Sequence, residues 1–194
     1  MTNAEPQRVV MVRRDLERIP EFALPEGFSL RWYQPGDEDL WIRIHLATER
    51  LRAITSELFF QQFGCDPQLL AQRQCYLHEP HGAVVGTSTA WFDNAFEGQR
   101  YGRVHWVAIA PDFQGRGLGK SLVTQTCRRL RDLGHERTYL ATSALRLPAI
   151  GLYLQFGFEP LVRTEADAAL WARIRANLRP SNPDTRSSRT KQPF

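Results

Sequence analysis

The chain has 194 residues, 42% of them hydrophobic and 24% charged, a size and composition that suit one globular domain with its own core. Its three cysteines include no C-x-x-C pair, which excludes a disulfide framework and a cysteine-rich zinc site and favours a reducing compartment. No apolar run approaches the length of a membrane span, and the first residues lack the apolar core of a secretion signal. We therefore expect a cytoplasmic protein with no membrane partner and no metal.

The net charge of +4 invites a nucleic-acid hypothesis, so its location matters. Half of it lies in residues 180–194, where Arg186, Arg189 and Lys191 outnumber Asp184 in a Pro/Ser-rich stretch. We expect this stretch to be a disordered basic tail. The rest of the chain is close to neutral and carries no zinc finger, basic zipper or aromatic-rich RNA motif. The sequence predicts no nucleic-acid partner.

The first half of the chain alternates short strands and helices. Residues 1–27 are interrupted by prolines and are expected to form an N-terminal arm, irregular or extended, before a domain over 28–179. A strand over 28–33 comes first. Capping residues then predict helices from 38 to about 52, from Thr55 or Ser56 to Gly64, and after Asp66. Strands over 75–78, 83–92 and 101–109 are expected to form an antiparallel meander.

The second half predicts a crossover. A glycine-rich turn over 114–119 is followed by an amphipathic helix that extends to Gly134. A strand over 137–142 is expected to run parallel to 101–109, because a whole helix separates the two. A helix over 148–156, a strand over 158–162 and a helix beginning at Thr164 follow. The predicted fold is α/β, with a mixed, mostly antiparallel sheet and one strand–helix–strand crossover.

The glycine turn does not fit either common nucleotide-binding motif. In a P-loop, G-x-x-x-x-G-K-[ST], the first glycine would fall on Gln114. In the dinucleotide motif, G-x-G-x-x-G, the third glycine would fall on Lys120 or Leu122, depending on the starting glycine. Both spacings fail, which argues against a nucleotide-binding protein. Glycine amides at a helix start remain a site for phosphate.

Two segments carry a family resemblance. Residues 107–120, VAIAPDFQGRGLGK, closely resemble the acyl-CoA signature of the GNAT superfamily of N-acyltransferases, written roughly V-x-P-x-x-Q/R-G-x-G-x-G/A. Residues 148–158, PAIGLYLQFGF, look like the second part of the family pattern, A-x-x-L-Y-x-x-x-G-F. The two segments lie in the family's order, one on each side of the predicted crossover. The resemblance implies the GNAT fold and acetyl-CoA or another acyl-CoA as cofactor.

The resemblance also implies how the cofactor is held. The turn amides would bind the pyrophosphate, helped by Arg116 and Lys120 unless these are simply exposed. Backbone groups of Val107 and Ile109 would pair with the pantetheine arm like an added strand. The family often has an Asn where this chain has Arg146, so Arg146 either meets a CoA phosphate or faces water. The expected cofactor-binding residues are Val107, Ala108, Ile109, Gln114, Gly115, Arg116, Gly117, Leu118, Gly119, Lys120 and Arg146.

The reaction implied is direct transfer, in which an acceptor amine attacks the thioester carbonyl. Tyr153 matches the family tyrosine that acts as general acid toward the sulfur; the alternative is a packed helix tyrosine. An amide of the 107–109 strand would stabilise the oxyanion. Period two places 103, 105, 107 and 109 on one face. Arg103 stands where family members often have a Glu that acts as the base, and an arginine cannot serve in that role. Our candidate base is therefore His105, which would act directly or through water. The alternatives are that His105 is a structural histidine or that an unrelated water chain removes the proton.

The acceptor stays open among small-molecule amines, amino-acid derivatives, peptide N-termini and protein lysines. The N-terminal arm would cover the site or an oligomer interface, and a homodimer is left open. A non-catalytic acyl-CoA-binding or sensing module competes with the enzyme, although the retained Tyr153 argues against it. Location alone makes seven residues candidates for the acceptor site: Trp41, Glu49, Glu57, Trp91, Phe92, Asp93 and Glu97. The alternative is that their carboxylates are simply part of the solvated surface.

Overall fold

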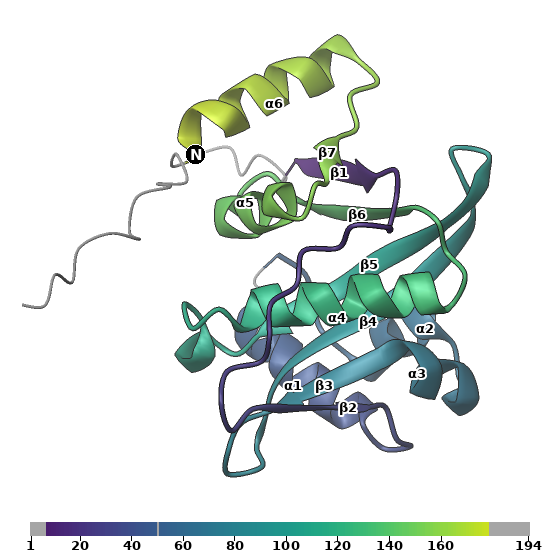
Figure 1. Cartoon of the computed structure of the whole chain (residues 1–194), viewed down its shortest axis with the longest axis vertical. Coiled ribbons are helices and arrows are strands. Elements are labelled where there is room, and N and C mark those ends of the chain that lie inside the picture. Colours follow the sequence, from purple (N-terminus) through teal and green to yellow (C-terminus); the bar gives the residue numbers. More distant parts are fainter. Residues whose placement is uncertain (1–6, 50, 179–194) are drawn as a thin grey trace, which may run out of the picture.

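A computed structural model describes residues 7–49 and 51–178, so the tail expected over 180–194 lies outside the described residues. One sheet runs through the molecule in the strand order β2-β3-β4-β5-β6-β1-β7 (Figure 1). Its strand pairs are antiparallel except β5 with β6, which are parallel. This confirms the predicted mixed sheet with one crossover. The strands are β1 Arg8–Arg13, β2 Ser29–Trp32, β3 Gln74–His78, β4 Val84–Phe96, β5 Gln99–Ile109, β6 Thr138–Ser143 and β7 Glu159–Pro160.

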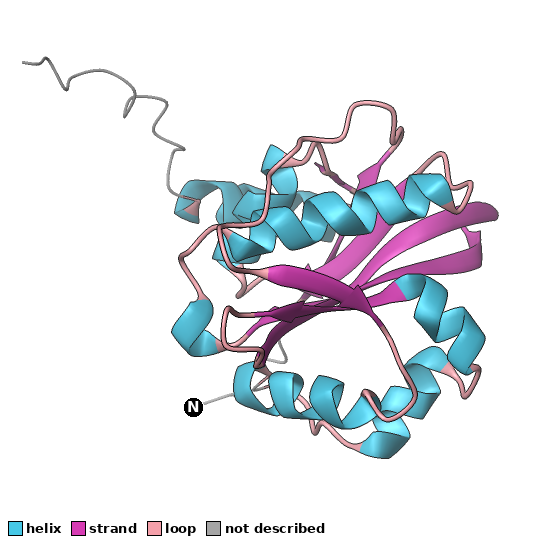
Figure 2. Cartoon of the chain, turned by 60° about the horizontal axis from the view of Figure 1, so that its bottom comes forward, coloured by secondary structure: helices cyan, strands magenta, loops and turns pink. Residues whose placement is uncertain are grey.

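Helices cover both faces of the sheet (Figure 2). On one face, α1 Glu38–Thr48 and α2 Ser56–Phe63 pack around the buried ring of Trp41, with α3 Pro67–Arg73 beside them. On the other face, α4 Leu118–Asp132, α5 Leu147–Gln155 and α6 Glu165–Asn177 share a core that includes Val123, Ile150 and Trp171. No helix within residues 7–49 and 51–178 is long and apolar enough to cross a membrane.

The predicted caps start α2, α3 and α6, whereas Asp37, the residue expected to cap α1, makes no capping hydrogen bond with its side chain and accepts from Arg31 at 2.7 Å instead. Thr55 accepts from the Leu58 amide at 3.2 Å, and Asp66 accepts from the amides of the first turn of α3. Thr164 and Asp167 form a reciprocal capping box at α6. The first helix ends earlier than predicted, at Thr48, because the backbone of Glu49 is extended.

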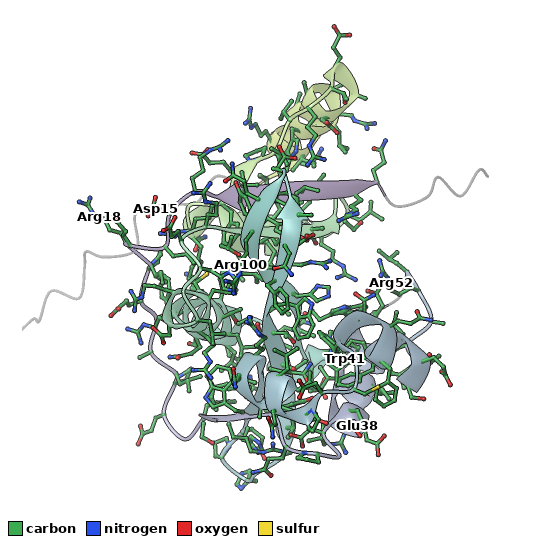
Figure 3. All side chains as sticks on the ribbon, turned by 90° about the vertical axis from the view of Figure 1, so that its right-hand side faces the viewer. Asp15, Arg18, Glu38, Trp41, Arg52 and Arg100 are labelled. Atoms are coloured by element: carbon green, nitrogen blue, oxygen red, sulfur yellow. The ribbon has the colours of Figure 1, made fainter. Side chains whose placement is uncertain are left out.

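The expected N-terminal arm contains a strand that the sequence analysis did not place. β1 lies in the sheet between β6 and β7, and residues 20–24 then run along α4, where Thr124 donates to the Pro20 carbonyl at 2.9 Å and Ser121 to the Ala23 carbonyl at 2.7 Å. Figure 3 shows Asp15 and Arg18 on the α4 side of the sheet, opposite Trp41 of α1. The described part of the arm is therefore part of the domain's body.

The prediction that 103, 105, 107 and 109 share a face is wrong beyond His105. The β4–β5 register shifts between Thr87, opposite Ala108, and Thr89, opposite His105, so β5 carries an extra residue there. Trp106, at the bulge, has a φ of 49°. His105, Trp106 and Ala108 consequently face α1 and α2. Val107 and Ile109 face α4 instead, with Val104.

Candidate active site

The parallel strands β5 and β6 separate soon after they meet. Gly102 pairs with Thr138 and Arg103 with Tyr139, and beyond these positions the two strands diverge. The gap opens into a cleft of about 910 Å³. Its walls are β5 from Arg103 to Ile109, β6 from Tyr139 to Ser143, the glycine turn, the end of α1 and the start of α5. We call this the β5–β6 cleft.

The backbone edge of β5 faces this cleft at the positions expected for a cofactor arm. The Ala110 amide donates to the Val85 carbonyl, on the β4 side, at 2.8 Å. Because backbone groups alternate along a strand, those of Ile109 and Val107 point to the opposite side. The Gln114 side chain donates to the Ile109 carbonyl at 2.9 Å, which agrees with that direction. Val107 therefore offers its amide and carbonyl to an extended ligand in the cleft.

The glycine turn holds a run of free amides at the start of α4. Gly115 and Gly117 have φ values of 76° and 80°, the left-handed region in which glycine is favoured. Among the described residues, none accepts a hydrogen bond from the backbone amides of residues 115–119. The Lys120 amide donates to the Gly117 carbonyl at 2.9 Å, so it is already engaged. These free donors, at the positive end of a helix, fit the pyrophosphate of an acyl-CoA.

The two basic side chains expected beside the phosphates point elsewhere in this structure. Arg116 donates to the Asp112 carbonyl at 2.9 Å and lies over the Phe113 ring. The Lys120 ammonium lies 5.0 Å from the centre of the Phe22 ring. Neither side chain belongs to the cleft wall. Their contact with a cofactor stays a prediction.

Tyr153 lies on α5 with its ring packed and its edge at the cleft. The residue is 8% exposed, and the ring stands edge-on to Phe158. Within the described part of the chain, its hydroxyl has no hydrogen-bond partner. Burial raises the pKa of Tyr153 to about 12, more than the nearby charge of Arg146 lowers it. The phenol therefore keeps its proton throughout the neutral range.

His105 is held by Gln62, a residue of α2 that carried no sequence signal. The Gln62 Oε1 atom lies 3.0 Å from Trp106 Nε1 and 3.1 Å from His105 Nε2. Because an indole nitrogen only donates, the Gln62 oxygen must accept, and His105 carries its proton on Nε2. Nδ1 is then the basic atom. Burial, and after it the charge of Arg103, holds the pKa of His105 well below its usual range, so the ring is neutral.

One residue that the sequence analysis missed, His45, and one that it named, Arg146, line the same cleft. His45 of α1 is buried against the Trp106 ring, and burial lowers its pKa to about 3. Its position four residues after Trp41, on the buried helix face, is the signal that could have indicated it. Arg146 donates to Glu49 at 2.6 Å, which joins the start of α5 to the end of α1. Its contact with a CoA phosphate stays a prediction.

The acceptor candidates are only partly brought together. Glu49 and Asp93 line the cleft, whereas Trp41 is fully buried beneath it. The candidates outside the cleft wall are Glu57, Trp91, Phe92 and Glu97.

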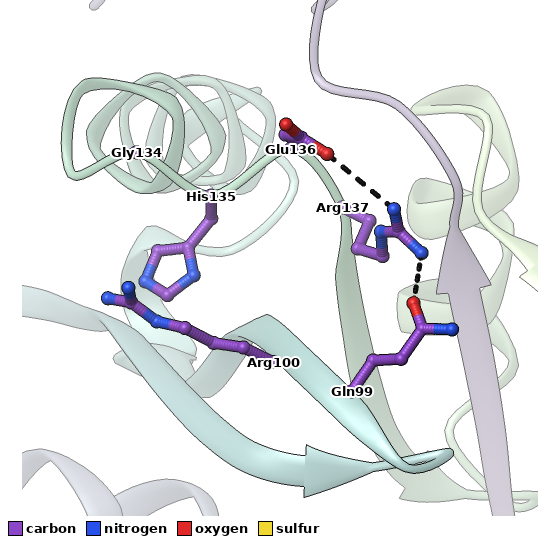
Figure 4. Close-up of a pocket in the computed structure, with 6 residues that line it drawn as sticks. All are labelled: Gln99, Arg100, Gly134, His135, Glu136 and Arg137. Atoms are coloured by element: carbon purple, nitrogen blue, oxygen red, sulfur yellow. Dashed lines mark hydrogen bonds and ion pairs between the residues drawn. The ribbon is translucent and has the colours of Figure 1, made fainter.

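A second, smaller hollow of about 230 Å³ lies between the end of α4 and the start of β5 (Figure 4). There Arg137 contacts both Glu136 and Gln99. Arg137 is therefore already paired, and the amides of Gly134 and His135 donate to carbonyls of α4. The β5–β6 cleft is the better candidate for an active site.

Gln62 allows a stability test of the His105–Trp106 arrangement. Replacing Gln62 with methionine removes the acceptor shared by two partly buried N–H groups, and we expect a loss of about 1–3 kcal/mol in the free energy of unfolding, measured in urea. The Gln62→Glu variant keeps an acceptor and should lose less. Equal losses in the two variants would contradict the shared hydrogen bonds.

Comparisons with known proteins agree with this fold. The model of the GNAT acetyltransferase family matches residues 38–158, more than half of the chain. The chain therefore belongs to the GNAT family.

Among curated relatives, the mycothiol acetyltransferase of Pseudarthrobacter chlorophenolicus is 32% identical over 159 residues, which cover 72% of this chain and 45% of that protein. The mycothiol acetyltransferase of Saccharomonospora viridis is 33% identical over 153 residues, covering 72% of this chain and 48% of that protein. The chain thus spans about half the length of these relatives.

Solved structures share the fold. A GCN5-related N-acetyltransferase from Sphaerobacter thermophilus superposes with a TM-score of 0.64 at 21% identity, covering 79% of this chain and 48% of that chain. The ribosomal-protein-S18-alanine N-acetyltransferase from Escherichia coli superposes with a TM-score of 0.56 at 18% identity, covering 70% of this chain and 79% of that chain. At these identities, the likeness supports the fold alone.

Proposed function

We propose that this protein is an acyl-CoA-dependent N-acyltransferase that acetylates a primary amine by direct transfer in a ternary complex. The observation that carries the proposal is the β5–β6 cleft, which joins an unpaired strand edge to the free amides of residues 115–119. Family membership and the names of the curated relatives favour acetyl as the transferred group. The three cysteines are free thiols, which favours the cytoplasm as its location.

In the proposed reaction, acetyl-CoA supplies an activated thioester. The turn amides bind its pyrophosphate, and the Val107 carbonyl orients the pantetheine arm. A nitrogen–carbon bond forms as the carbon–sulfur bond breaks, and the amine loses one proton. The amide of Val107 stabilises the charge on the carbonyl oxygen. Tyr153 donates its proton to the leaving sulfur and is later reprotonated from solvent.

His105 is the proposed acceptor of the amine proton, directly or through water. Its neutral ring and its Nδ1 lone pair suit that role, but its lowered pKa makes it a weak base. The proton must therefore pass quickly to solvent. The ring's position against Gln62 is also compatible with a purely structural histidine, so the role requires a kinetic test.

The test is the His105→Gln variant, measured against pH. Because the His105 ring is already neutral, the pH–rate profile should show no fall in activity near the ordinary pKa of a histidine. The log of kcat/KM should rise with a slope of one as the amine loses its proton, in both enzymes. In the variant, kcat should fall about 100-fold at every pH. A variant that keeps its kcat within about twofold would leave His105 a structural role only.

The cofactor assignment is tested by thermal shift with acetyl-CoA, CoA, ATP and NAD. We expect acetyl-CoA and CoA to raise Tm, because a ligand that binds only the folded state stabilises it. A shift with ATP or NAD and none with CoA would overturn the proposal. A shift with CoA but no turnover with any amine would favour the alternative, a non-catalytic acyl-CoA-binding module.

A further inference from the structure

Three arginines of the β5–β6 cleft come from three different elements. Arg8 begins β1, Arg52 follows α1, and Arg103 lies on β5, and all three line the cleft. Figure 3 shows Arg52 on the same side of the sheet as Trp41. Arg103 precedes Ile109 by six residues of β5, which places it roughly 20 Å from the turn. Arg103 is therefore separate from the proposed pyrophosphate site. Burial lowers the pKa of His105 and the charges of all three arginines lower it further, which indicates that they lie near one another, and we call them the arginine cluster.

The cluster lacks internal partners. Within residues 7–49 and 51–178, Arg8, Arg52 and Arg103 form no ion pair and donate no hydrogen bond. The Arg103 Nε atom is fully buried without a partner. Leaving a buried guanidinium donor unsatisfied is costly, so such a group is expected to meet an acceptor when the site is filled.

Two of the three guanidinium groups are held by aromatic rings. The Arg103 guanidinium lies 5.5 Å from the centre of the Tyr139 ring, and that of Arg52 lies 5.4 Å from the centre of the Trp106 ring. Stacking of this kind fixes the plane of a guanidinium while leaving its N–H groups free at the edges. Planar forks of this type match a carboxylate or a phosphate.

The acidic groups of the cleft are already engaged. Asp93 accepts from the Tyr139 hydroxyl at 2.9 Å and from the Ala95 amide at 3.0 Å. Glu49 accepts from Arg146 at 2.6 Å. Burial lowers the pKa of Arg103; the charge of Arg8 adds to this effect, and the charge of Asp93 opposes it. Four arginines thus line the cleft against the two carboxylates of Glu49 and Asp93, an excess of positive charge that repels a cationic acceptor such as a polyamine.

We propose that the arginine cluster, centred on Arg103, binds a carboxylate or phosphate of the acceptor, so that the substrate is an anionic primary amine. This inference rests on the proposed function and names the substrate class for the same cleft. The anion anchors the acceptor at the cluster, and the amine reaches toward His105 and the thioester. Arg103 is thus a specificity-determining residue, and it takes no part in proton transfer.

The test compares matched amines that differ in one anionic group: β-alanine with β-alaninamide, phosphoserine with serine, and glucosamine 6-phosphate with glucosamine. Thiol release from acetyl-CoA gives kcat/KM, and calorimetric titration into the CoA-saturated protein gives binding without turnover. We expect at least one anionic amine to have a kcat/KM and an affinity about 10- to 100-fold higher than those of its neutral partner, because a charge-assisted hydrogen bond contributes a free energy of that size.

Two variants assign that preference. Arg103→Gln should remove it: the ratio of kcat/KM for the anionic amine to that for its neutral partner should fall to about one, and this ratio is unaffected by any change that the variant makes to both rates alike. The matched control is Arg137→Gln, whose guanidinium also lies over a tyrosine, 5.6 Å from the centre of the Tyr101 ring, but outside the cleft. The control should keep the preference. Comparable circular dichroism and Tm will establish that both variants fold.

The outcomes separate the two proposals. Equal binding of anionic and neutral amines to the wild type, or a preference that survives Arg103→Gln, would overturn the anionic-acceptor inference even if transfer occurs. Preferential binding of an anionic amine that depends on Arg103, without thiol release from any amine, would support the inference and contradict the proposed enzyme. Preferential turnover that depends on Arg103 supports both.

Discussion

Replacing Tyr153 with phenylalanine should lower kcat about 100-fold or more while the KM for acetyl-CoA stays nearly constant. The reason is that only the hydroxyl is lost, and with it the proton for the leaving sulfur. The ring remains packed against Phe158, and the hydroxyl has no partner among the described residues whose loss would disturb the fold. Tm should therefore change little. Steady-state thiol release with saturating amine measures the effect.

The matched control for this variant is Tyr101→Phe. Tyr101 is as buried as Tyr153 but does not line the cleft, so the loss of its hydroxyl should leave kcat within about twofold. If Tyr153→Phe kept the wild-type kcat, Tyr153 would be a packing residue. A large rise in KM at unchanged kcat would instead assign it to cofactor binding.

The Gly119→Asp variant should weaken CoA binding by about 100-fold or more, because it places a carboxylate among the amides proposed to hold the pyrophosphate. The new charge should not lower the Tm of the unliganded protein, because an acidic residue in the first turn of a helix is favourable. The new Cβ would lie 3.3 Å from Leu152 Cδ2, a flexible side-chain end that can shift. Calorimetric titration with CoA and the Tm of the free protein give the two quantities.

The control adds the same charge farther along the same helix. Gln125→Asp lies in the middle of α4, away from the free amides, and should keep its affinity for CoA within about threefold. If Gly119→Asp bound CoA as tightly as the wild type does, the phosphates would not be held at this turn. An equal loss in both variants would indicate a general effect of charge.

Local signals in the sequence predicted most of the fold. Thr55, Asp66 and Thr164 cap their own helices, and a cap acts through amides two or three residues away. β1 was missed because its partners are β6 and β7, more than a hundred residues later in the chain. No short turn joins this six-residue strand to a strand that pairs with it, so no local pattern in the sequence indicates it.

Short motifs predicted residues that lie together at one cleft, whereas features that depend on packing were missed; the roles of these residues stay predictions. The glycine turn and Tyr153 follow from short sequence patterns, and both line the cleft beside the predicted crossover. The bulge at Trp106 breaks period two, and no residue type in the strand indicates it. Gln62 and His45 matter because α1 and α2 press them against that bulge, which is a tertiary effect.

The most direct test of the account is whether release of the CoA thiol depends on an amine. With acetyl-CoA and an anionic primary amine, the protein should release one thiol for each amine that gains an acetyl group, as confirmed by mass spectrometry of the product. Tyr153→Phe should slow both together. If acetyl-CoA raises Tm but no amine in the panel is acetylated or accelerates thiol release, the protein binds the cofactor without transferring its acetyl group, and the central claim is wrong.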